Sequence, residues 1–412
     1  MTKAVITGMG VISPIGNDID TFWASIKAGK SGLGPITRFD ATEFDSRVAA
    51  EVKNFEASQF MDKKDARKMA LFTQFAVAAA VQAWKQAALE GSGVDLERVA
   101  VVMGNGIGGI EIFEESHKKL LSSGPSRMLP LTVPMMITNE AAGNISIHFG
   151  IKGPTLTTAT ACASGTDALG QAMDMIRSGR ADVVVAGGTE GAISAFAVGS
   201  FCMLKALSTA YNDNPQKASR PFDSARDGFV IGEGAGVMIL ESEAHARARG
   251  AKILGELAGY GSSCDAYHVT APEPSGDGGA LAIRLALKDA GIAPESVAYY
   301  NAHGTSTQMN DPIETQMVKK AFGDHARKMK VSSTKSMTGH MIAAAGAVEA
   351  IVCALAIQDG FFPPTINLDK ADEACDLDYV PNVGVYGTID AAASGSLGFG
   401  GHNACVVLRK YK

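Results

Sequence analysis

The protein has 412 residues, of which 46% are hydrophobic and 19% charged, enough to bury a large core over two or three domain-sized units. Its net charge of −6 argues against non-specific binding to nucleic acid or to an anionic membrane, so any basic site must be local. The six cysteines form no C-x-x-C pair and no cluster with histidine, which indicates neither a zinc site nor a disulfide framework. A reducing, cytoplasmic compartment fits, and we expect no signal peptide or transmembrane span.

The first part of the chain predicts alternating strands and helices. Strands are expected at 4–7 and 98–103, with a long, central helix at 62–89 between them. The second strand leads into a G-x-G-x-x-G match at 104–109, and 110–121 favours a helix, as in a dinucleotide-binding turn. The acidic residue expected about 20 residues later is missing, because 122–127 is a loop. A crossing where a backbone or an acyl group approaches closely is therefore the preferred interpretation.

Two further segments have features that suggest function. Residues 129–137 are apolar but twice interrupted by proline, which argues against a central strand and suits a subunit interface. Residues 208–230 are polar and rich in turn formers, which predicts a long ordered loop of the kind that is often functional.

Cys162 lies at a predicted strand-to-helix turn. The β-branched run 153–157 predicts a buried strand, and apolar residues at helical spacing follow at 168–176. Free N–H groups and the positive end of the helix dipole would favour the thiolate over the thiol there. The alternative is a small buried core residue.

Near residue 251 the pattern begins again, so we expect two α/β halves, 1–250 and 251–412. Strands are predicted at 252–260, 297–301 and 331–334, and helices at 279–290, 312–322 and 341–357. The strand-turn-helix unit around Cys162 has its counterpart in residues 330–357, which include His340. His303 also lies at a strand end. A duplicated fold would bring these turns to the same end of the strands, where α/β sheets place ligands.

Four motifs carry a family resemblance over essentially the whole chain: Thr-Ala-Cys162-Ala-Ser-Gly, Asn-Ala-His303-Gly-Thr-Ser-Thr, Lys335-Ser-Met-Thr-Gly-His340 and Gly398-Phe399-Gly-Gly. Their order and separations resemble those of elongating, type II β-ketoacyl-acyl-carrier-protein synthases. The resemblance implies a thiolase-like fold with α-β-α-β-α layers, a homodimer, a Cys-His-His triad and no cofactor. Cysteine with one histidine alone would suggest acyl transfer like that of thiol proteases. Initiating synthases carry Cys-His-Asn and thiolases Cys-His-Cys, so His340 points to the decarboxylating branch.

The implied reaction is a decarboxylative condensation in fatty-acid elongation. Cys162 would take an acyl chain from acyl carrier protein, and His303 and His340 would stabilise the enolate formed from malonyl-carrier protein. Backbone N–H groups of Cys162 and Phe399 would hold the tetrahedral oxygen, and the Phe399 ring could gate the pocket. Lys335 would supply a charge, paired with Glu349 and near Asp311 and Glu314; a purely structural salt bridge is the alternative.

The resemblance also implies binding positions. Ile107, Phe201, Met341 and Ile342 match acyl-pocket positions, although they would equally fill a core. Thr305 and Thr307, with Thr270, match the hydroxyls that hold the pantetheine arm. Lys64, Arg67 and Lys68 share one predicted helical face that could dock an acidic carrier protein, with Lys205 beside it; a solvated face, half neutralised by Asp62 and Asp65, is the alternative.

The sequence departs from the family at Gly395, where relatives usually have asparagine. That asparagine helps to bind a monovalent cation in some relatives, together with residues matching Asn301 and Glu349, so no metal is assigned. Ketosynthases of aromatic polyketide pathways share every motif named above and remain the alternative. A non-catalytic chain-length subunit would be expected to lack Cys162.

Overall fold

The structure is a computed structural model that describes residues 2–412. Ten strands form one mixed sheet in the order β10-β9-β13-β14-β8-β1-β7-β6-β4-β5. It consists of two sets of five with the same pairing pattern, two antiparallel neighbours followed by two parallel ones. The first set comprises β1 (Ala4–Ile12), β7 (Gly234–Ser242), β6 (Val183–Glu190), β4 (Val99–Gly104) and β5 (Thr155–Thr158). The second comprises β8 (Gly255–Cys264), β14 (His402–Arg409), β13 (Ala391–Gly398), β9 (Tyr299–Asn301) and β10 (Lys330–Ser332).

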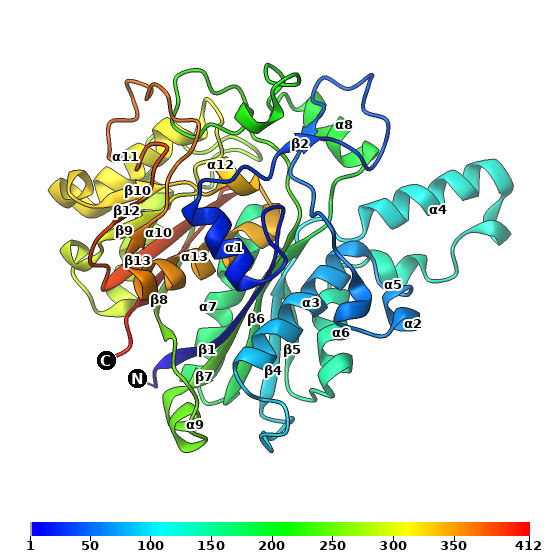
Figure 1. Cartoon of the computed structure of the whole chain (residues 1–412), viewed down its shortest axis with the longest axis horizontal. Helices are drawn as coiled ribbons and strands as arrows, with labels where there is room; N and C mark the ends of the chain where they lie inside the picture. Colours follow the sequence, from blue (N-terminus) through cyan, green and yellow to red (C-terminus); the bar gives the residue numbers. More distant parts are fainter. Residues whose placement is uncertain (1) are drawn as a thin grey trace.

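Helices complete five layers (Figure 1). Two of them, α7 (Ser164–Arg177) and α13 (Ala345–Asp359), lie between the two sets of strands and contact both. On the outer faces, α3 (Leu71–Gln86) packs on β1 and β7, and α10 (Asp277–Ala290) packs on β8 and β14. This is the predicted thiolase-like α-β-α-β-α arrangement. Only three residue pairs join β1 to β8, and the predicted division between residues 250 and 251 falls just before β8.

The central helix α13 is buried on every side from Ala345 to Ile357, as expected for a helix without a polar face. The stretch Ile342–Asp359 is long and apolar enough to cross a membrane, but 89% of it is buried inside the protein. It is therefore accounted for as a core helix.

The remaining helices and strands surround this core. The helices are α1 (Ile19–Lys27), α2 (Lys63–Ala66), α4 (Ile110–Ser123), α5 (Thr132–Met136), α6 (Glu140–Phe149), α8 (Ala195–Met203), α9 (Glu243–Ala248), α11 (Asn310–Phe322) and α12 (Lys335–Thr338). Two short strand pairs are β2 (Gly34–Pro35) with β3 (Val48–Ala49), and β11 (Phe361–Phe362) with β12 (Val385–Tyr386).

The prediction of one central helix over 62–89 was wrong. Asp62 caps the short helix α2 by accepting the N–H of Lys64 at 2.7 Å. The chain then leaves the helical conformation at Ala70, whose ψ is 164°, before α3 begins. Helix α3 lies in an outer layer and is therefore not the central helix expected there. The central helices are α7 and α13.

The glycine-rich stretch 104–109 is a backbone crossing, as the sequence suggested. A Cβ on Gly104 would lie 2.4 Å from the carbonyl carbon of Ser164 at the start of α7. Cβ atoms on Gly108 and Gly109 would lie 2.3 and 2.4 Å from carbonyl oxygens of α5. Close approach between chain segments therefore explains these glycines.

An arm formed by α4 and α5 projects from the body of the molecule (Figure 1). Its exposed apolar side chains are Phe113, Leu121, Met128, Leu131, Val133 and Ile137. The segment predicted as a subunit interface, 129–137, includes α5. The strand expected to be buried before Cys162 is β5, which lies at the edge of the sheet and leaves Leu156 44% exposed.

Candidate active site

Cys162 lies in a single 3-10 turn, Ala161–Ala163, directly before α7. Ala161 has a φ of +50°, a left-handed conformation that costs a non-glycine residue about 1–2 kcal/mol. Ser164 holds this turn in place: its hydroxyl donates to the carbonyl of Ala161 at 2.6 Å and accepts the N–H of Thr160 at 2.9 Å. The predicted strand-turn-helix unit is confirmed.

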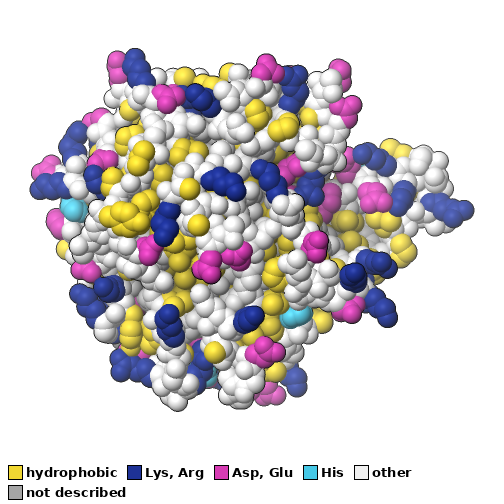
Figure 2. Space-filling view, in the orientation of Figure 1, with side chains coloured by type: hydrophobic (Ala, Val, Ile, Leu, Met, Phe, Trp, Pro, Cys, Tyr) yellow, Lys and Arg dark blue, Asp and Glu magenta, His cyan; other side chains and the backbone are white. Residues whose placement is uncertain are grey.

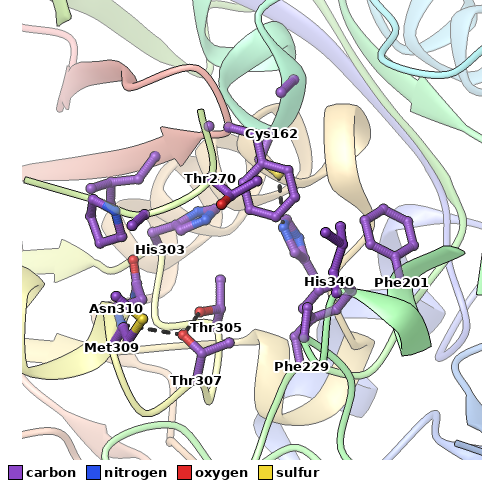
Figure 3. Close-up of a pocket in the computed structure, with 18 of the residues that line it drawn as sticks. Cys162, Phe201, Phe229, Thr270, His303, Thr305, Thr307, Met309, Asn310 and His340 are labelled. Atoms are coloured by element: carbon purple, nitrogen blue, oxygen red, sulfur yellow. Dashed lines mark hydrogen bonds between the residues drawn. The ribbon is translucent and has the colours of Figure 1, made fainter. Parts of the chain in front are cut away.

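His340 occupies the corresponding turn in the second half. It follows α12 and precedes another 3-10 turn, Ile342–Ala344, in which Ile342 has a φ of +47°. Its Nε2 lies 3.1 Å from the sulfur of Cys162. His303 follows β9, and its ring lies edge-on to that of His340, with centroids 5.2 Å apart. One ring nitrogen of each histidine and the Cys162 sulfur lie within 4.8 Å of one another (Figure 3).

Lys335 determines which nitrogen of His303 carries the proton. Its ammonium group is buried, forms an ion pair with Glu349 and lies 3.4 Å from Nδ1 of His303. An ammonium group can only donate, so Nδ1 accepts and the proton of the neutral ring is on Nε2. Burial, then the charge of Lys335 and the neighbouring His340, lowers the pKa of His303 well below its usual value. His303 is thus a neutral N–H donor.

The thiol of Cys162 differs from the sequence-based prediction. Burial, together with the charge of Glu190, raises its pKa to about 12, although the charge of Lys335 and the N–H groups of Phe399 and Cys162 oppose this rise. The predicted thiolate at the helix start is therefore wrong for the free protein, because loss of water around the sulfur outweighs the helix N-terminus. The pKa of His340 is likewise lowered, first by burial, so a neutral imidazole contacts a neutral thiol.

Two further buried carboxylates, Glu314 and Asp311, lie beside the site, and Glu314 binds the backbone there. Glu314 accepts the N–H groups of His303 at 2.7 Å and Gly304 at 2.6 Å. Burial raises its pKa to about 7, and these N–H groups oppose the rise. Asp311 lies 3.6 Å from Arg226. Glu349, whose pKa burial also raises to about 7 against the charge of Lys335, is the carboxylate that pairs with Lys335 directly.

Cys162, His303 and His340 border one cavity of about 470 Å³, a size typical of small-molecule sites. Its apolar lining includes Ile107, Phe201, Phe229 and Ile342. Phe229 lies edge-on to His340, with ring centroids 5.3 Å apart. Hydroxyl and amide side chains gather on another wall of the same cavity (Figure 3): Thr305, Thr307 and Asn310.

Comparison with known proteins places this geometry in a family. The model for the β-ketoacyl synthase N-terminal domain matches residues 1–246, and that for the C-terminal domain matches residues 254–369. The chain belongs to the β-ketoacyl synthase family. It is 48% identical over 410 residues to 3-oxoacyl-[acyl-carrier-protein] synthase 2 of Synechocystis sp., covering 100% of this chain and 98% of that one.

Two other relatives bear on this family. The protein of the same name from Coxiella burnetii is 49% identical over 408 residues, 99% of this chain and 98% of that one. Among solved structures, a ketosynthase described as bound to its type II PKS acyl-carrier protein (AntDE:AntF) aligns with a TM-score of 0.93 at 37% identity. The alignment covers 100% of both chains.

The predicted acyl-pocket residues of this β-ketoacyl synthase fall into two groups. Ile107, Phe201 and Ile342 line the cavity. Met341 lies outside the described cavity lining: it is 1% exposed, belongs to the central core and packs against Gly234. The left-handed φ of Ile342 redirects the chain between these neighbours, which explains why one residue faces the cavity and the other the core.

The three predicted pantetheine-binding threonines all line the cavity. The hydroxyls of Thr305 and Thr307 lie 3.0 Å apart. Arg226 holds their loop, because its buried guanidinium donates to the carbonyls of Thr307 at 2.9 Å and Gln308 at 3.1 Å. Thr270 is exposed on a separate loop.

Phe399 lies in the turn between β13 and β14, with its side chain 38% exposed at the cavity. Its backbone N–H and that of Cys162 both lower the pKa of the Cys162 thiol, so both N–H groups lie beside the nucleophile. A Cβ on Gly398 would lie 2.5 Å from the carbonyl oxygen of Thr160. Glycine there lets this turn approach the nucleophile.

The predicted docking residues are exposed but do not form one patch in a single chain. Lys64, Arg67 and Lys68 belong to α2 and the residues just after it, and Lys68 pairs with Asp65 at 3.1 Å. Lys205 follows α8, well separated from α2 in Figure 1, and pairs with Asp45 at 3.0 Å. The expectation that Lys205 lies beside the other three is wrong for the described chain. All four residues are exposed, and the face of the molecule drawn in Figure 2 carries both basic and acidic side chains.

Gly395 does not leave room for the asparagine of the relatives. A Cβ there would lie 1.9 Å from the hydroxyl of Tyr300, so Tyr300 occupies that position. Both polar atoms of the Asn301 amide and Oε2 of Glu349 are buried without a hydrogen bond within residues 2–412. The residues present lack the side-chain ligand that the cation site of relatives would use, and no catalytic step described below needs such an ion.

Phe229 and Glu190 were missed in the sequence. Phe229 lies near the end of 208–230, a segment whose composition predicts an ordered loop but indicates no particular residue. Glu190 closes β6 and is fully buried; burial raises its pKa to about 8 against several N–H groups. A carboxylate after Gly-Gly-Thr at the end of a buried strand was the available signal.

Proposed function

We propose that this protein catalyses the decarboxylative condensation of malonyl-acyl-carrier protein with a Cys162-bound acyl group, giving 3-oxoacyl-acyl-carrier protein in fatty-acid elongation. The observation that carries this proposal is the convergence of Cys162, His303 and His340 on one largely apolar cavity. A thiol supplies the acyl attachment, and two neutral imidazoles supply donors for a developing oxyanion.

The first half-reaction transfers the acyl group to Cys162. The thiol proton passes to Nε2 of His340, 3.1 Å away, as the sulfur attacks the thioester carbonyl. The N–H groups of Cys162 and Phe399 stabilise the tetrahedral oxygen. Collapse breaks the bond to the carrier's sulfur, which takes the proton from His340 and leaves as the free thiol.

The second half-reaction begins with malonyl-carrier protein. Loss of CO₂ leaves the electron pair of the broken C–C bond in an enolate, whose oxygen accepts from Nε2–H of His303. Nε2 of His340, which accepts the thiol proton in the first half-reaction, donates to the same oxygen after exchange with solvent has moved the proton of the neutral ring from Nδ1 to Nε2. The carbon then attacks the Cys162 thioester, and the Cys162 thiolate leaves. Its high pKa favours uptake of one proton from solvent, which restores the starting state.

Acyl carrier protein is the proposed partner, and the proposed assembly is a homodimer in the cytoplasm. The exposed apolar arm α4–α5 and the edge strand β5 support the dimer, because such surfaces pair with another chain. Carrier-protein docking is proposed at Lys64, Arg67, Lys68 and Lys205. The division into halves 1–250 and 251–412 is proposed as well.

A ketosynthase of a type II polyketide pathway is the second candidate, favoured by the likeness to AntDE:AntF. The higher identity to the 3-oxoacyl-[acyl-carrier-protein] synthases, 48–49% against 37%, favours fatty-acid elongation. The test is intact-mass spectrometry after incubation with saturated acyl-carrier proteins of several chain lengths, followed by malonyl-carrier protein. Fatty-acid elongation requires an acyl adduct on Cys162 and one two-carbon extension; repeated extension without ketone reduction would indicate the polyketide reaction instead.

A further inference from the structure

Glu190 links three segments that meet beside the cavity. It ends β6 and has no exposed surface. One carboxyl oxygen accepts the N–H of Gly106 at 3.1 Å; the other accepts the N–H of Ile107 at 3.4 Å and the side-chain amide of Asn105 at 3.2 Å. The N–H of Ala343 also lowers the pKa of this carboxyl group. None of the catalytic steps above uses this group.

Two of these segments carry the apolar wall next to the nucleophile. Ile107 and Ile342, the neighbour of Ala343, line the cavity together with Cys162. The packing is tight, because a Cβ on Gly106 would lie 2.9 Å from Oε2 of Glu190 and 3.4 Å from Cγ2 of Ile342. The carboxyl therefore lies between the backbones that carry the two isoleucines, is hydrogen-bonded to the first of them, and contributes to the distance between them.

We propose that Glu190 is a positioning residue that determines acyl-chain selectivity by fixing Ile107 and Ile342 against each other. The proposal rests on the proposed function, since it assumes that the substrate is an acyl thioester. A rigid cavity wall discriminates between acyl chains by their length and shape. If the wall can move, the cavity also accepts acyl chains that the native cavity rejects. One methylene group in a rigid apolar pocket is worth about 10–200-fold in rate.

Glu190→Gln tests this at nearly constant volume. In either protonation state the carboxyl offers two oxygens to the N–H groups, whereas the amide offers one and turns its own N–H₂ toward them. A buried N–H left without an acceptor is costly, so the stretch 105–107 has to move. Asn105→Ala, which removes one donor to the same carboxyl, should have a smaller effect in the same direction.

The experiment is a competition between octanoyl- and hexadecanoyl-carrier proteins for Cys162, read as the ratio of adducts by intact mass. We expect the discrimination of the wild type to fall at least threefold in Glu190→Gln. The rate of Cys162 alkylation by iodoacetamide should not fall, because that reagent does not need the wall and loss of the Glu190 charge removes one cause of the raised pKa of Cys162. Glu241→Gln is the matched control: Glu241 is equally buried but binds Thr7, His245 and Arg249 instead.

The outcomes distinguish failure of the Glu190 proposal from failure of the proposed function. Retained discrimination in Glu190→Gln, or an equal fall in Glu241→Gln, would overturn the selectivity role. If Glu190→Gln does not fold, the same comparison is made with Asn105→Ala, where discrimination equal to that of the wild type counts against the proposal. Absence of any adduct on the wild-type protein would instead contradict the proposed function.

Discussion

Nζ of Lys335 lies 3.4 Å from Nδ1 of His303, so a buried charge fixes the tautomer of a group that we propose as a catalytic donor. The same ammonium group balances Glu349. Two roles, structural and electrostatic, are therefore combined in one side chain.

Lys335→Ala should lose both roles. Removal of one partner from a buried ion pair leaves an uncompensated charge, which costs about 3–5 kcal/mol of unfolding free energy. Lys335→Ala/Glu349→Gln removes both charges and should regain most of that stability in thermal denaturation. Decarboxylation of malonyl-carrier protein should stay at least tenfold below wild type in both proteins. Full activity in the double variant would mean that Lys335 is only structural.

Cys162→Ala should abolish the acyl adduct, since no other thiol lines the cavity among the described residues. Intact-mass spectrometry after incubation with acyl-carrier protein is the measurement. Cys162→Gln should still decarboxylate malonyl-carrier protein, because that step needs the histidines and not the sulfur. An adduct retained on Cys162→Ala would place the nucleophile elsewhere.

His303→Ala and His340→Ala should separate the half-reactions. Loss of either donor should slow decarboxylation by about a hundredfold or more, as for other oxyanion donors. Some acylation of Cys162 should persist, because the N–H groups of Cys162 and Phe399 remain. Release of CO₂ at the wild-type rate from either variant would contradict the donor pair.

The pKa of Cys162 predicts how its reactivity changes with pH. Only the thiolate is alkylated. With a pKa raised to about 12, the thiolate fraction should grow about tenfold per pH unit between pH 7 and 10. Iodoacetamide labelling of a Cys264→Ser background, which removes the exposed thiol, should show this rise without a plateau. A plateau below pH 8 would restore the thiolate that the sequence suggested.

Charge reversal at Lys64 or Arg67 should raise KM for carrier-bound substrate, with an effect that weakens as salt is added. A small acyl thioester without carrier protein never meets α2, so its turnover should be nearly unchanged. Lys205 lies at the cavity lining, and its reversal should act on the carrier-bound substrate as well. Equal losses on both substrates would indicate damage to the fold.

Local patterns predicted the strand-turn-helix unit around Cys162 well, because a β-branched run followed by apolar residues at helical spacing has few other solutions. The 178-residue separation between Cys162 and His340 could be bridged only by recognising the repeated half. Once that repeat is assumed, strand ends at one edge of the sheet bring His303 into the same site.

Features that depend on three-dimensional burial were not predictable in the same way. The helix start suggested a thiolate at Cys162, but the depth of the site reverses the direction of its pKa. Neighbours such as Met341 and Ile342 look alike in sequence, and a single backbone angle sends one to the core and the other to the cavity. Lys205 and the basic residues of α2 are expected side by side from charge and from the resemblance, but the fold places α2 and α8 apart.

The left-handed residues Ala161 and Ile342 imply a trade-off between stability and activity at both turns. Glycine would relieve about 1–2 kcal/mol of strain at either position. It would also let the turn relax away from the geometry that brings sulfur and imidazole to 3.1 Å. Glycine at either position should therefore raise the stability of the fold. It should also lower activity, because the turn no longer holds the nucleophile in place.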